Sequence, residues 1–409
     1  MLFRGESSMP AAFACTQKKK EEFIMKVSYW NRFCPTLFGT GAVDLIGEKT
    51  KELGIEKVMV VTEADLIKFN VATRVIDNLK AAGFDPVIFD KCKADAPSDV
   101  CDEGAKVAKE NKVDGIVAVG GGSSLDTAKA IGIIISMGGE SITEFYTTSC
   151  KERKMKLICI STTAGTGSEN SQYAVIGDSK TGVKQVPEYS PDLAMVDPTM
   201  TYTLPKSQTA STGMDALAHC AEAITSKNWN PYVYAIGGIG ISTVMKYLPT
   251  AVKDPQNVEA REKMAFAANL GGLVILESGC QMGHAFSQAF GGKYHVPHGL
   301  GCAWGFPGSM VYAAKYGDPE SAKIVADAMG VAYDDGTAPE ELAKRLGDRS
   351  IELMKEIGIP SMKASGYSLE DALSVAEVMS KDAAIANAPG EHNLDQIKEY
   401  IEYTFNAYQ

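Results

Sequence analysis

The alternation of apolar and polar positions changes character about halfway along the chain. In the first half, short apolar runs recur at intervals of roughly 30 to 40 residues, and helix-like stretches separate most of them. Short apolar strands that alternate with helices are typical of a parallel sheet covered on both faces. We therefore expect an α/β domain with a parallel sheet in this half. The apolar runs begin at Lys57, Pro86, Gly115, Leu157 and Leu193.

From Pro205 onward the strand pattern stops, and apolar residues recur with the helical period instead. We place the domain boundary between Leu204 and Pro205, which gives an α/β domain over residues 27–204 and an all-α domain over residues 205–409. Residues 1–26 hold only a very short apolar stretch followed by a basic cluster, so we expect a disordered extension rather than a signal peptide. The helices expected in the second domain cover residues 208–226, 232–247, 258–277, 319–329, 338–357, 368–379 and 394–405.

Composition is that of an ordinary globular protein, with 45% hydrophobic and 22% charged residues. The formal net charge of −11 argues against nucleic acid or an anionic membrane as a partner, because both require clustered Lys and Arg. No apolar run reaches the roughly 18 residues of a membrane-spanning helix. The nine cysteines form no C-x-x-C pair and indicate reduced thiols. We therefore expect a cytoplasmic protein with a small-molecule partner.

Four side chains are spaced as ligands of a divalent metal ion. Asp215 and His219 lie four residues apart in STGMDALAHCAEA, so in a helix they project from one face. His284 and His298 follow in GHAFSQAFGGKYHVPHG, where a Gly-Gly break and a proline separate them. A single Asp-x-x-x-His pair is more often an ordinary surface pair, but here two further histidines follow it, and the chain has only five histidines in all. Imidazole nitrogens and a carboxylate suit Zn²⁺ or Fe²⁺ and leave room for a substrate.

Two glycine-rich loops follow predicted strands. In GIVAVGGGSSLDTAKA, an apolar run leads into three glycines and a helix opened by Ser123 and Ser124. The unpaired amide groups at such a helix start bind phosphate. The spacing is not G-x-G-x-x-G, and a triple glycine alone is equally consistent with an ordinary tight turn. In LICISTTAGTGSEN, a second strand runs into a Thr/Gly loop whose hydroxyls and amides suit a cofactor's ribose, phosphate or ring amide.

Five segments in this order resemble the motifs of the iron-containing alcohol dehydrogenases: GGGSSLDTAKA, STTAGTGSE, LAMVDP, GMDALAHCAEA and the H…PHG pair. This family shares its fold with glycerol dehydrogenase and dehydroquinate synthase. The resemblance covers nearly the whole chain, from Val27 to the C-terminus. It implies an N-terminal nucleotide-binding α/β domain, a C-terminal all-helical domain, and a metal ion with NAD(P) in the cleft between them.

Carried over by position, the resemblance gives roles to individual residues of this chain. The implied metal ligands are Asp215, His219, His284 and His298, with Fe²⁺ as the implied ion and Zn²⁺ as the alternative. Glu63 stands where NAD-preferring members carry an acid, which accepts a hydrogen bond from the ribose hydroxyl and repels a 2′-phosphate, so we expect NAD. The other expected cofactor contacts are Gly121, Gly122, Ser123 and Asp126 on the diphosphate side, Thr162, Thr163 and Thr166 nearer the nicotinamide, and Lys184.

The sequence departs from the family pattern in two ways. Where the family commonly has a histidine credited with proton transfer, this chain has Gln288, whose amide cannot titrate. A proton relay must then use another group, such as His295, a ribose hydroxyl or water, and Gln288 is the candidate for a hydrogen bond to substrate or cofactor. Polar residues also stand where pocket walls are expected, which favours a short polar aldehyde as substrate. A similar GG-x-YHVPHG motif occurs in the 4-hydroxybutyrate dehydrogenase branch of the family. These residues are Asn170, Gln172, Gln281, Lys293 and His295.

We therefore expect a metal-dependent NAD(H) alcohol dehydrogenase or aldehyde reductase of a fermentative cell. Its expected substrate is a short polar aldehyde. This class includes anionic aldehydes such as a semialdehyde or sulfoacetaldehyde. The alternatives are a short-chain primary alcohol dehydrogenase of the butanol or propanediol type, a glycerol-type polyol dehydrogenase and a hydroxyacid–oxoacid transhydrogenase. A lyase of the dehydroquinate synthase type is disfavoured because the region between Asp215 and His298 has only scattered basic residues. We also expect a homodimer or higher homo-oligomer.

Overall fold

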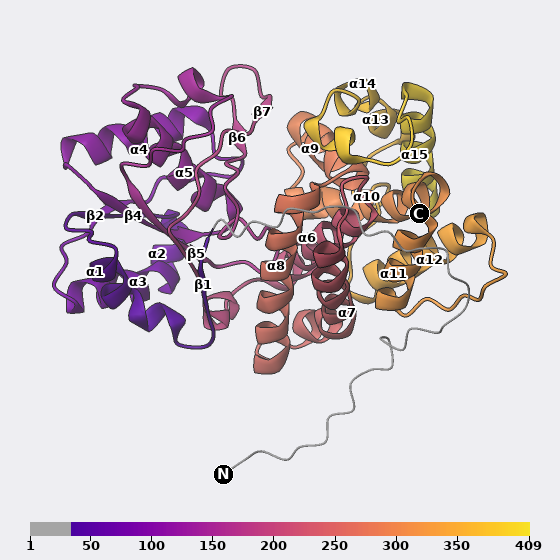
Figure 1. The fold of residues 1–409 in the computed structure, drawn as a ribbon, viewed down its shortest axis with the longest axis horizontal. Helices are drawn as coiled ribbons and strands as arrows, with labels where there is room; N and C mark the ends of the chain where they lie inside the picture. Colours follow the sequence, from indigo (N-terminus) through magenta and orange to yellow (C-terminus); the bar gives the residue numbers. More distant parts are fainter. Residues whose placement is uncertain (1–33) are drawn as a thin grey trace, which may run out of the picture.

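A six-stranded parallel sheet forms the centre of the first domain in the computed structural model, which describes residues 34–409 (Figure 1). The strands lie in the order β1-β8-β5-β4-β2-β3, and every neighbouring pair is parallel. The five apolar runs all form strands, and the predicted α/β class is confirmed. The strands are β1 (Thr36–Phe38, not predicted), β2 (Val58–Val61), β3 (Val87–Phe89), β4 (Gly115–Gly120), β5 (Lys156–Ser161) and β8 (Leu193–Val196).

Helices cover both faces of this sheet, as strands buried on both sides require. Successive residues of β2 point to opposite faces, so Val58 and Val60 join one core cluster while Met59 and Val61 join the other. Figure 1 shows α1 to α3 on one face and α4 and α5 on the other. The helices are η2 (Ala42–Leu45), α1 (Ile46–Glu52), α2 (Ala64–Lys68), α3 (Val71–Ala81), α4 (Ser98–Glu110), α5 (Gly122–Met137), η3 (Ile142–Phe145) and η4 (Pro198–Thr201).

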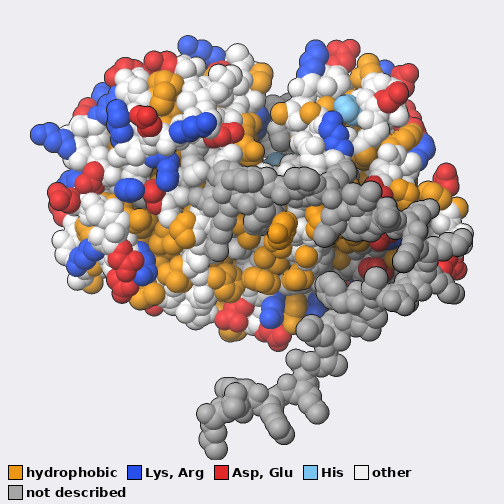
Figure 2. Space-filling view, viewed as in Figure 1, with side chains coloured by type: hydrophobic (Ala, Val, Ile, Leu, Met, Phe, Trp, Pro, Cys, Tyr) orange, Lys and Arg blue, Asp and Glu red, His pale blue; other side chains and the backbone are white. Residues whose placement is uncertain are grey.

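From Lys206 to Gln409 the chain forms helices and no strand, and these helices pack around one hydrophobic core. The helical domain lies beside the first domain (Figures 1 and 2). Each of the seven predicted stretches contains a helix, although residues 368–379 divide into two short helices. The helices are α6 (Lys206–Thr225), α7 (Pro231–Lys253), α8 (Val258–Ser278), α9 (Met282–Tyr294), α10 (His298–Tyr316), α11 (Pro319–Met329), α12 (Pro339–Glu356), α13 (Leu369–Leu373), α14 (Ala376–Met379), η5 (Ala383–Asn387) and α15 (Leu394–Ala407).

Helices α9 and α10 occupy the segment that we expected to be broken by a glycine pair, and that expectation is wrong. Gly291 and Gly292 lie inside the last turn of α9, which ends only at His295, a residue with a left-handed φ of 56°. The helix continues through both glycines because its other face is anchored in the domain core by Phe286 and Phe290. Tertiary packing thus outweighs the low helix propensity of glycine here.

A short antiparallel hairpin follows the Thr/Gly loop and is also absent from the sequence prediction. It pairs β6 (Ile176–Gly177) with β7 (Lys184–Gln185). Figure 1 shows β7 on the side of the first domain that faces the second domain. The hairpin therefore carries Lys184 to the inter-domain side of the sheet.

The Thr/Gly loop after β5 joins the two domains by direct backbone contact. A Cβ atom added to Gly167 would lie 2.3 Å from the Cα of Gly272 in α8. A Cβ added to Gly165 would lie 2.8 Å from the carbonyl oxygen of Thr212 in α6. Glycine is therefore required at both loop positions for the two domains to approach this closely.

Buried hydrogen bonds reinforce this junction. Asn269 of α8 donates to the carboxylate of Glu169 over 3.1 Å, and Asn170 donates to the carbonyl of Asn269 over 3.1 Å. Thr36 of β1 donates to the side-chain oxygen of Asn170 over 2.9 Å. Both the loop and the edge strand are thereby held against the helical domain.

Within residues 34–409, none of the helices combines the length and apolarity needed to cross a membrane. The eight cysteines of this part of the chain form no disulfide with one another. Most of them are buried. The extension that we predict over residues 1–26 lies outside the described residues.

Replacement of Gly167 by alanine should destabilise the domain junction. Its φ of 61° costs an L-residue about 1 kcal/mol, and the new methyl group would overlap the backbone of Gly272. We expect the free energy of unfolding to fall by about 2–4 kcal/mol in urea or thermal unfolding. Gly182→Ala is the matched control, because its φ is 71° and its added Cβ would have no atom within 4 Å. An equal decrease in the free energy of unfolding in both variants would contradict close backbone contact at the domain junction.

Candidate metal centre and cofactor cleft

Three helices of the second domain bring the four predicted metal ligands together. Asp215 and His219 lie one turn apart on α6, His284 lies in the first turn of α9, and His298 is the first residue of α10. The Oδ1 atom of Asp215 lies 3.7 Å from Nε2 of His219, 3.4 Å from Nε2 of His284 and 3.6 Å from Nε2 of His298. One carboxylate oxygen therefore faces three imidazole nitrogens.

This arrangement fits a divalent metal ion. Donors bound tetrahedrally at about 2.1 Å lie about 3.4 Å from one another, close to the observed separations. Asp215 Oδ1 and His284 Nε2 are buried and have no hydrogen-bond partner. Burying such groups unpaired costs several kcal/mol unless a cation compensates. The donor set, with nitrogen and oxygen atoms, suits Fe²⁺ or Zn²⁺.

The four proposed ligands differ in their electrostatic environment and in their exposure to solvent. Burial opposes ionisation of Asp215, but the charges of the surrounding imidazoles outweigh burial and hold its pKa well below its usual range. Asp215, His219 and His284 are almost inaccessible, whereas 41% of the His298 side chain is exposed. The cluster therefore opens to the outside of the helical domain through His298.

One further acid of the site, Glu222, was not predicted from the sequence and lies three residues after His219 on α6. Its Oε2 atom lies 2.9 Å from Nδ1 of His284, and it is completely buried. It also accepts hydrogen bonds from the backbone amides of Gln281 and Gly283 and from the hydroxyl of Ser309. A carboxylate on the second nitrogen of a histidine directs the first nitrogen toward a metal. The sequence signal was an acid on the ligand-bearing helix, within an otherwise apolar stretch.

The predicted diphosphate cradle forms where β4 passes into α5. The helix begins at Gly122 with Gly121 at its N-cap, one residue earlier than the serine start that we predicted. A Cβ on Gly122 would lie 2.9 Å from Cγ2 of Thr166, and one on Gly121 would lie 3.3 Å from Cγ2 of Thr163. The two loops therefore converge, and only glycine leaves space between them. Free backbone amides at this helix start fit a diphosphate.

The hydroxyl-bearing residues around the cradle differ in what they contact. Thr163 Oγ1 is buried without a partner, as expected for a group that awaits a ligand. Thr166 Oγ1 accepts from the amide of Ser168, and Ser123 Oγ accepts from the amide of Asp95. The amide of Thr162 donates to the last residue of β4. All three threonines therefore lie on the loop that faces the glycines.

The carboxylate of Asp126 is fully engaged within the protein. It accepts from Lys129 over 3.0 Å, from the hydroxyl of Ser168 over 2.7 Å and from the amide of Val175 over 3.1 Å. Both Asp126 and Lys129 are buried in α5. In this structure Asp126 fixes the Thr/Gly loop to the cradle, and its contact with the cofactor stays a prediction.

Lys184 links the cofactor cradle to the metal centre. Its ammonium group pairs with Asp95, whose backbone amide contacts Ser123 at the start of α5. The pKa of His298 is lowered chiefly because its ring nitrogens face the protein interior, and the charges of His284 and Lys184 add to this effect. The positive charge of Lys184 on this hairpin therefore acts on His298 as well as on Asp95.

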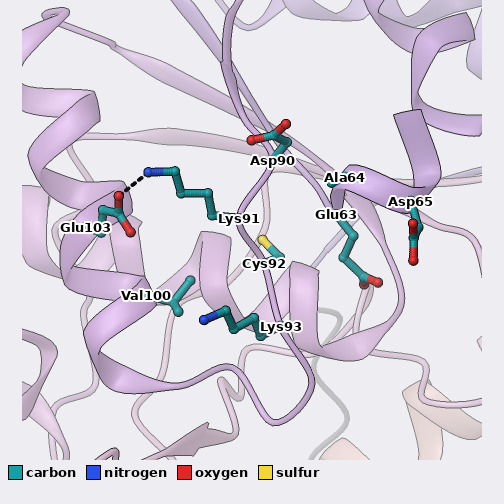
Figure 3. A pocket seen from close by; sticks show the side chains of 9 residues that line it. All are labelled: Glu63, Ala64, Asp65, Asp90, Lys91, Cys92, Lys93, Val100 and Glu103. Carbon is teal, nitrogen blue, oxygen red and sulfur yellow. Dashed lines mark hydrogen bonds and ion pairs between the residues drawn. The ribbon is translucent and has the colours of Figure 1, made fainter. Parts of the chain in front are cut away.

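Glu63 lines a cavity of about 390 Å³ at the carboxyl ends of β2 and β3 (Figure 3). Ligands bind at this edge of parallel sheets. The carboxylate of Glu63 accepts a hydrogen bond of 2.8 Å from Ser124 in the first turn of α5, which fixes it beside the cradle. Figure 3 also shows Glu103 across the cavity, where it pairs with Lys91.

The predicted catalytic residues lie on the same helix as His284. Gln288 is half-buried one turn further along α9, and His295 is exposed at its C-terminal end. Both therefore lie on the segment that connects the ligands His284 and His298. Their roles stay predictions.

Three of the five polar residues that we expected in the pocket are engaged elsewhere, and this part of the prediction is wrong. Asn170 is buried in the domain junction. Gln281 is buried and donates to the carbonyl of Glu222 and the hydroxyl of Thr225. Lys293 donates to the hydroxyl of Ser374 in the C-terminal helices. Gln172 is half-buried and His295 exposed.

Comparisons with known proteins identify the family of this chain. The family model of the iron-containing alcohol dehydrogenases matches residues 35–198, and the model of the C-terminal part of the Fe-containing alcohol dehydrogenase family matches residues 209–405. Choline dehydrogenase of Bacillus subtilis is 35% identical over 88% of this chain and 91% of its own length. NAD-dependent methanol dehydrogenase of Bacillus methanolicus is 32% identical over 91% of this chain and 99% of its own length.

The fold is shared with solved structures as well. The alcohol dehydrogenase from Oenococcus oeni superimposes with a TM-score of 0.86 at 31% identity, covering 92% of this chain and 100% of that one. The two family models together span most of the described residues. The chain therefore belongs to the iron-containing alcohol dehydrogenase family and is an NAD-dependent oxidoreductase of alcohols.

Proposed function

We propose that this protein interconverts a short polar primary alcohol and its aldehyde with NAD(H), at a metal held by Asp215, His219, His284 and His298. The observation that carries the proposal is the buried Asp215 oxygen that faces three imidazole nitrogens without a hydrogen-bond partner. Fe²⁺ is the ion that the family name implies, and Zn²⁺ suits the same donors.

In the oxidative direction, the alcohol loses a hydride to the nicotinamide and a proton from its hydroxyl group, which gives aldehyde, NADH and a proton. A divalent cation supplies Lewis acidity that favours loss of this proton. The chain's own residues orient the reactants. The glycines at the start of α5 would hold the diphosphate, and the hydroxyl of Thr163, which has no partner within the protein, would bind the cofactor.

Proton transfer cannot involve the side chain at position 288 as a titrating group, because Gln288 is an amide. We assign it a hydrogen bond to the substrate or the nicotinamide. His295, exposed at the end of α9, is the group that exchanges the proton with water. The homodimer or higher homo-oligomer and the cytoplasmic location remain predictions.

The relatives named above act on choline and on methanol by their names, which supports a small alcohol. A second candidate is an anionic aldehyde such as a semialdehyde or sulfoacetaldehyde. Lys293 no longer supports it, but Lys184 does, because its positive charge reaches His298 and its side chain is only 20% exposed. A carboxylate or sulfonate on the substrate would complement this charge.

Asp215→Ala should abolish hydride transfer and metal binding while NAD binding is largely retained, because the cradle lies in the other domain. We expect activity below about 1% of wild type, measured as NADH formation, with metal content by elemental analysis. Glu399→Gln, an exposed acid of α15, is the control and should retain both. Metal-free Asp215→Ala protein that kept more than a few per cent of activity would refute the metal's role.

Glu63→Gln should weaken the preference for NAD over NADP. Loss of one charged hydrogen bond to the ribose corresponds to a decrease of about tenfold in the ratio of kcat/KM for NAD to that for NADP. Glu103→Gln removes an acid from the same cavity that pairs with Lys91, so its ratio should stay near wild type (Figure 3). Equal kcat/KM with both cofactors in the wild-type protein would rule out this role of Glu63.

Lys184→Met should reduce the ratio of kcat/KM for succinate semialdehyde or sulfoacetaldehyde to that for butanal by about fivefold at saturating NADH, the effect of one partly screened charge. Added salt should reduce the preference in the wild type. Lys180→Met, an exposed lysine in the turn of the same hairpin, is the control. Butanal as the best substrate of all three proteins would exclude the anionic candidate and leave the neutral one.

A further inference from the structure

A buried thiol lies directly beside the proposed metal ligands. Cys302 is on α10, four residues after His298, so both side chains leave the same helix face one turn apart. Its Sγ atom lies 3.5 Å from Nε2 of His298, and the residue is fully buried. Asp215 and His219 have the same spacing on α6. Each of the two helices therefore presents a pair of donors to the cluster.

The separations are compatible with a metal ion shared by these side chains. One potential donor atom each from Asp215, His284, His298 and Cys302 lies within 4.8 Å of all the others. In a tetrahedral site with a metal–sulfur distance of 2.3 Å and a metal–nitrogen distance of about 2.1 Å, sulfur and nitrogen lie about 3.6 Å apart. The observed 3.5 Å between Cys302 and His298 matches this value.

An independent observation points to a ligand in the same space. Asp215 Oδ1 and His284 Nε2 are both buried with no hydrogen-bond partner, and they lie 3.4 Å apart. Both belong to the group that includes Cys302. An ion that compensates these two atoms is therefore within reach of the thiol.

A second thiol, Cys280, lies near the cluster but in a different position. It groups with His219 and His284 only, and this group contains neither Asp215 nor His298. Cys280 precedes α9 in the chain and interacts with these two histidines. Cys302 is therefore the better placed sulfur donor.

We propose that Cys302 Sγ is a further ligand of the metal bound by Asp215, His219, His284 and His298. This inference rests on the proposed metal-dependent function and adds to it a sulfur donor. Metal binding then displaces the thiol proton, so the sulfur binds as thiolate. Because thiolate is a soft ligand, it shifts the preference of the centre from Fe²⁺ toward Zn²⁺ or Co²⁺.

The test uses Co²⁺ added to the full-length metal-free protein and read by absorption spectroscopy. Histidine and carboxylate ligands give weak visible bands, whereas a bound thiolate adds an intense charge-transfer band in the near ultraviolet. We expect this band in the wild type, its loss in Cys302→Ala and Cys302→Ser, and its retention in Cys280→Ala. Cys220→Ala is the matched control, because this buried thiol of α6 packs against α7 and α8, away from the cluster.

Two variants of Cys302 are used because either one alone could fail to fold. Visible cobalt bands in a variant show that its metal centre is intact. Visible bands without the charge-transfer band in the wild type would overturn the inference and leave the proposed function standing. Persistence of the band in both Cys302 variants, or its loss in Cys280→Ala alone, would also overturn it. A wild-type protein that binds no Co²⁺ and contains no Fe²⁺ or Zn²⁺ would contradict the proposed function itself.

Discussion

The burial of the Asp215 carboxylate is the constraint on which the helical domain depends. Glu222 on the same helix is equally buried, but its oxygens accept hydrogen bonds from backbone amides, a serine and His284. Asp215 Oδ1 has no such partner and faces three imidazoles. The hydrogen-bond donors of the protein therefore compensate the charge of Glu222, whereas the charge of Asp215 requires a cation. This difference is the physical basis for proposing a metal at Asp215.

The position of that acid matters for function only because the two domains are in direct contact. Gly167 and Gly272 place the Thr/Gly loop against α8 by backbone contact, and Asn170 and Asn269 add buried hydrogen bonds. The same loop faces the glycines at the start of α5. A single segment therefore borders the cofactor cradle and touches the domain that carries the metal ligands. Hydride transfer requires this alignment, since reacting atoms must approach to roughly 3–3.5 Å.

Much of the site was accessible from local sequence patterns. The spacing of Asp215 and His219 predicts one helix face whatever the rest of the fold, and the glycines after β4 predict a phosphate-binding helix start. Glu222 was missed because an acid beside apolar residues on a helix has no local mark of its role. Cys302 was missed because the sequence did not show that a helix begins at His298. Only within such a helix does the four-residue spacing place Cys302 and His298 on one face.

The sequence by itself determined the alternating strands, the helical second half and the donor residues, because these depend on short-range periodicity and on side-chain chemistry. Only the tertiary structure decided which polar groups face the site. Asn170, Gln281 and Lys293 are bound to Thr36, Glu222 and Ser374, residues that lie 59 to 134 positions away in the chain. A polar side chain is equally able to line a pocket or to satisfy a distant buried group, and long-range packing alone selects between these outcomes.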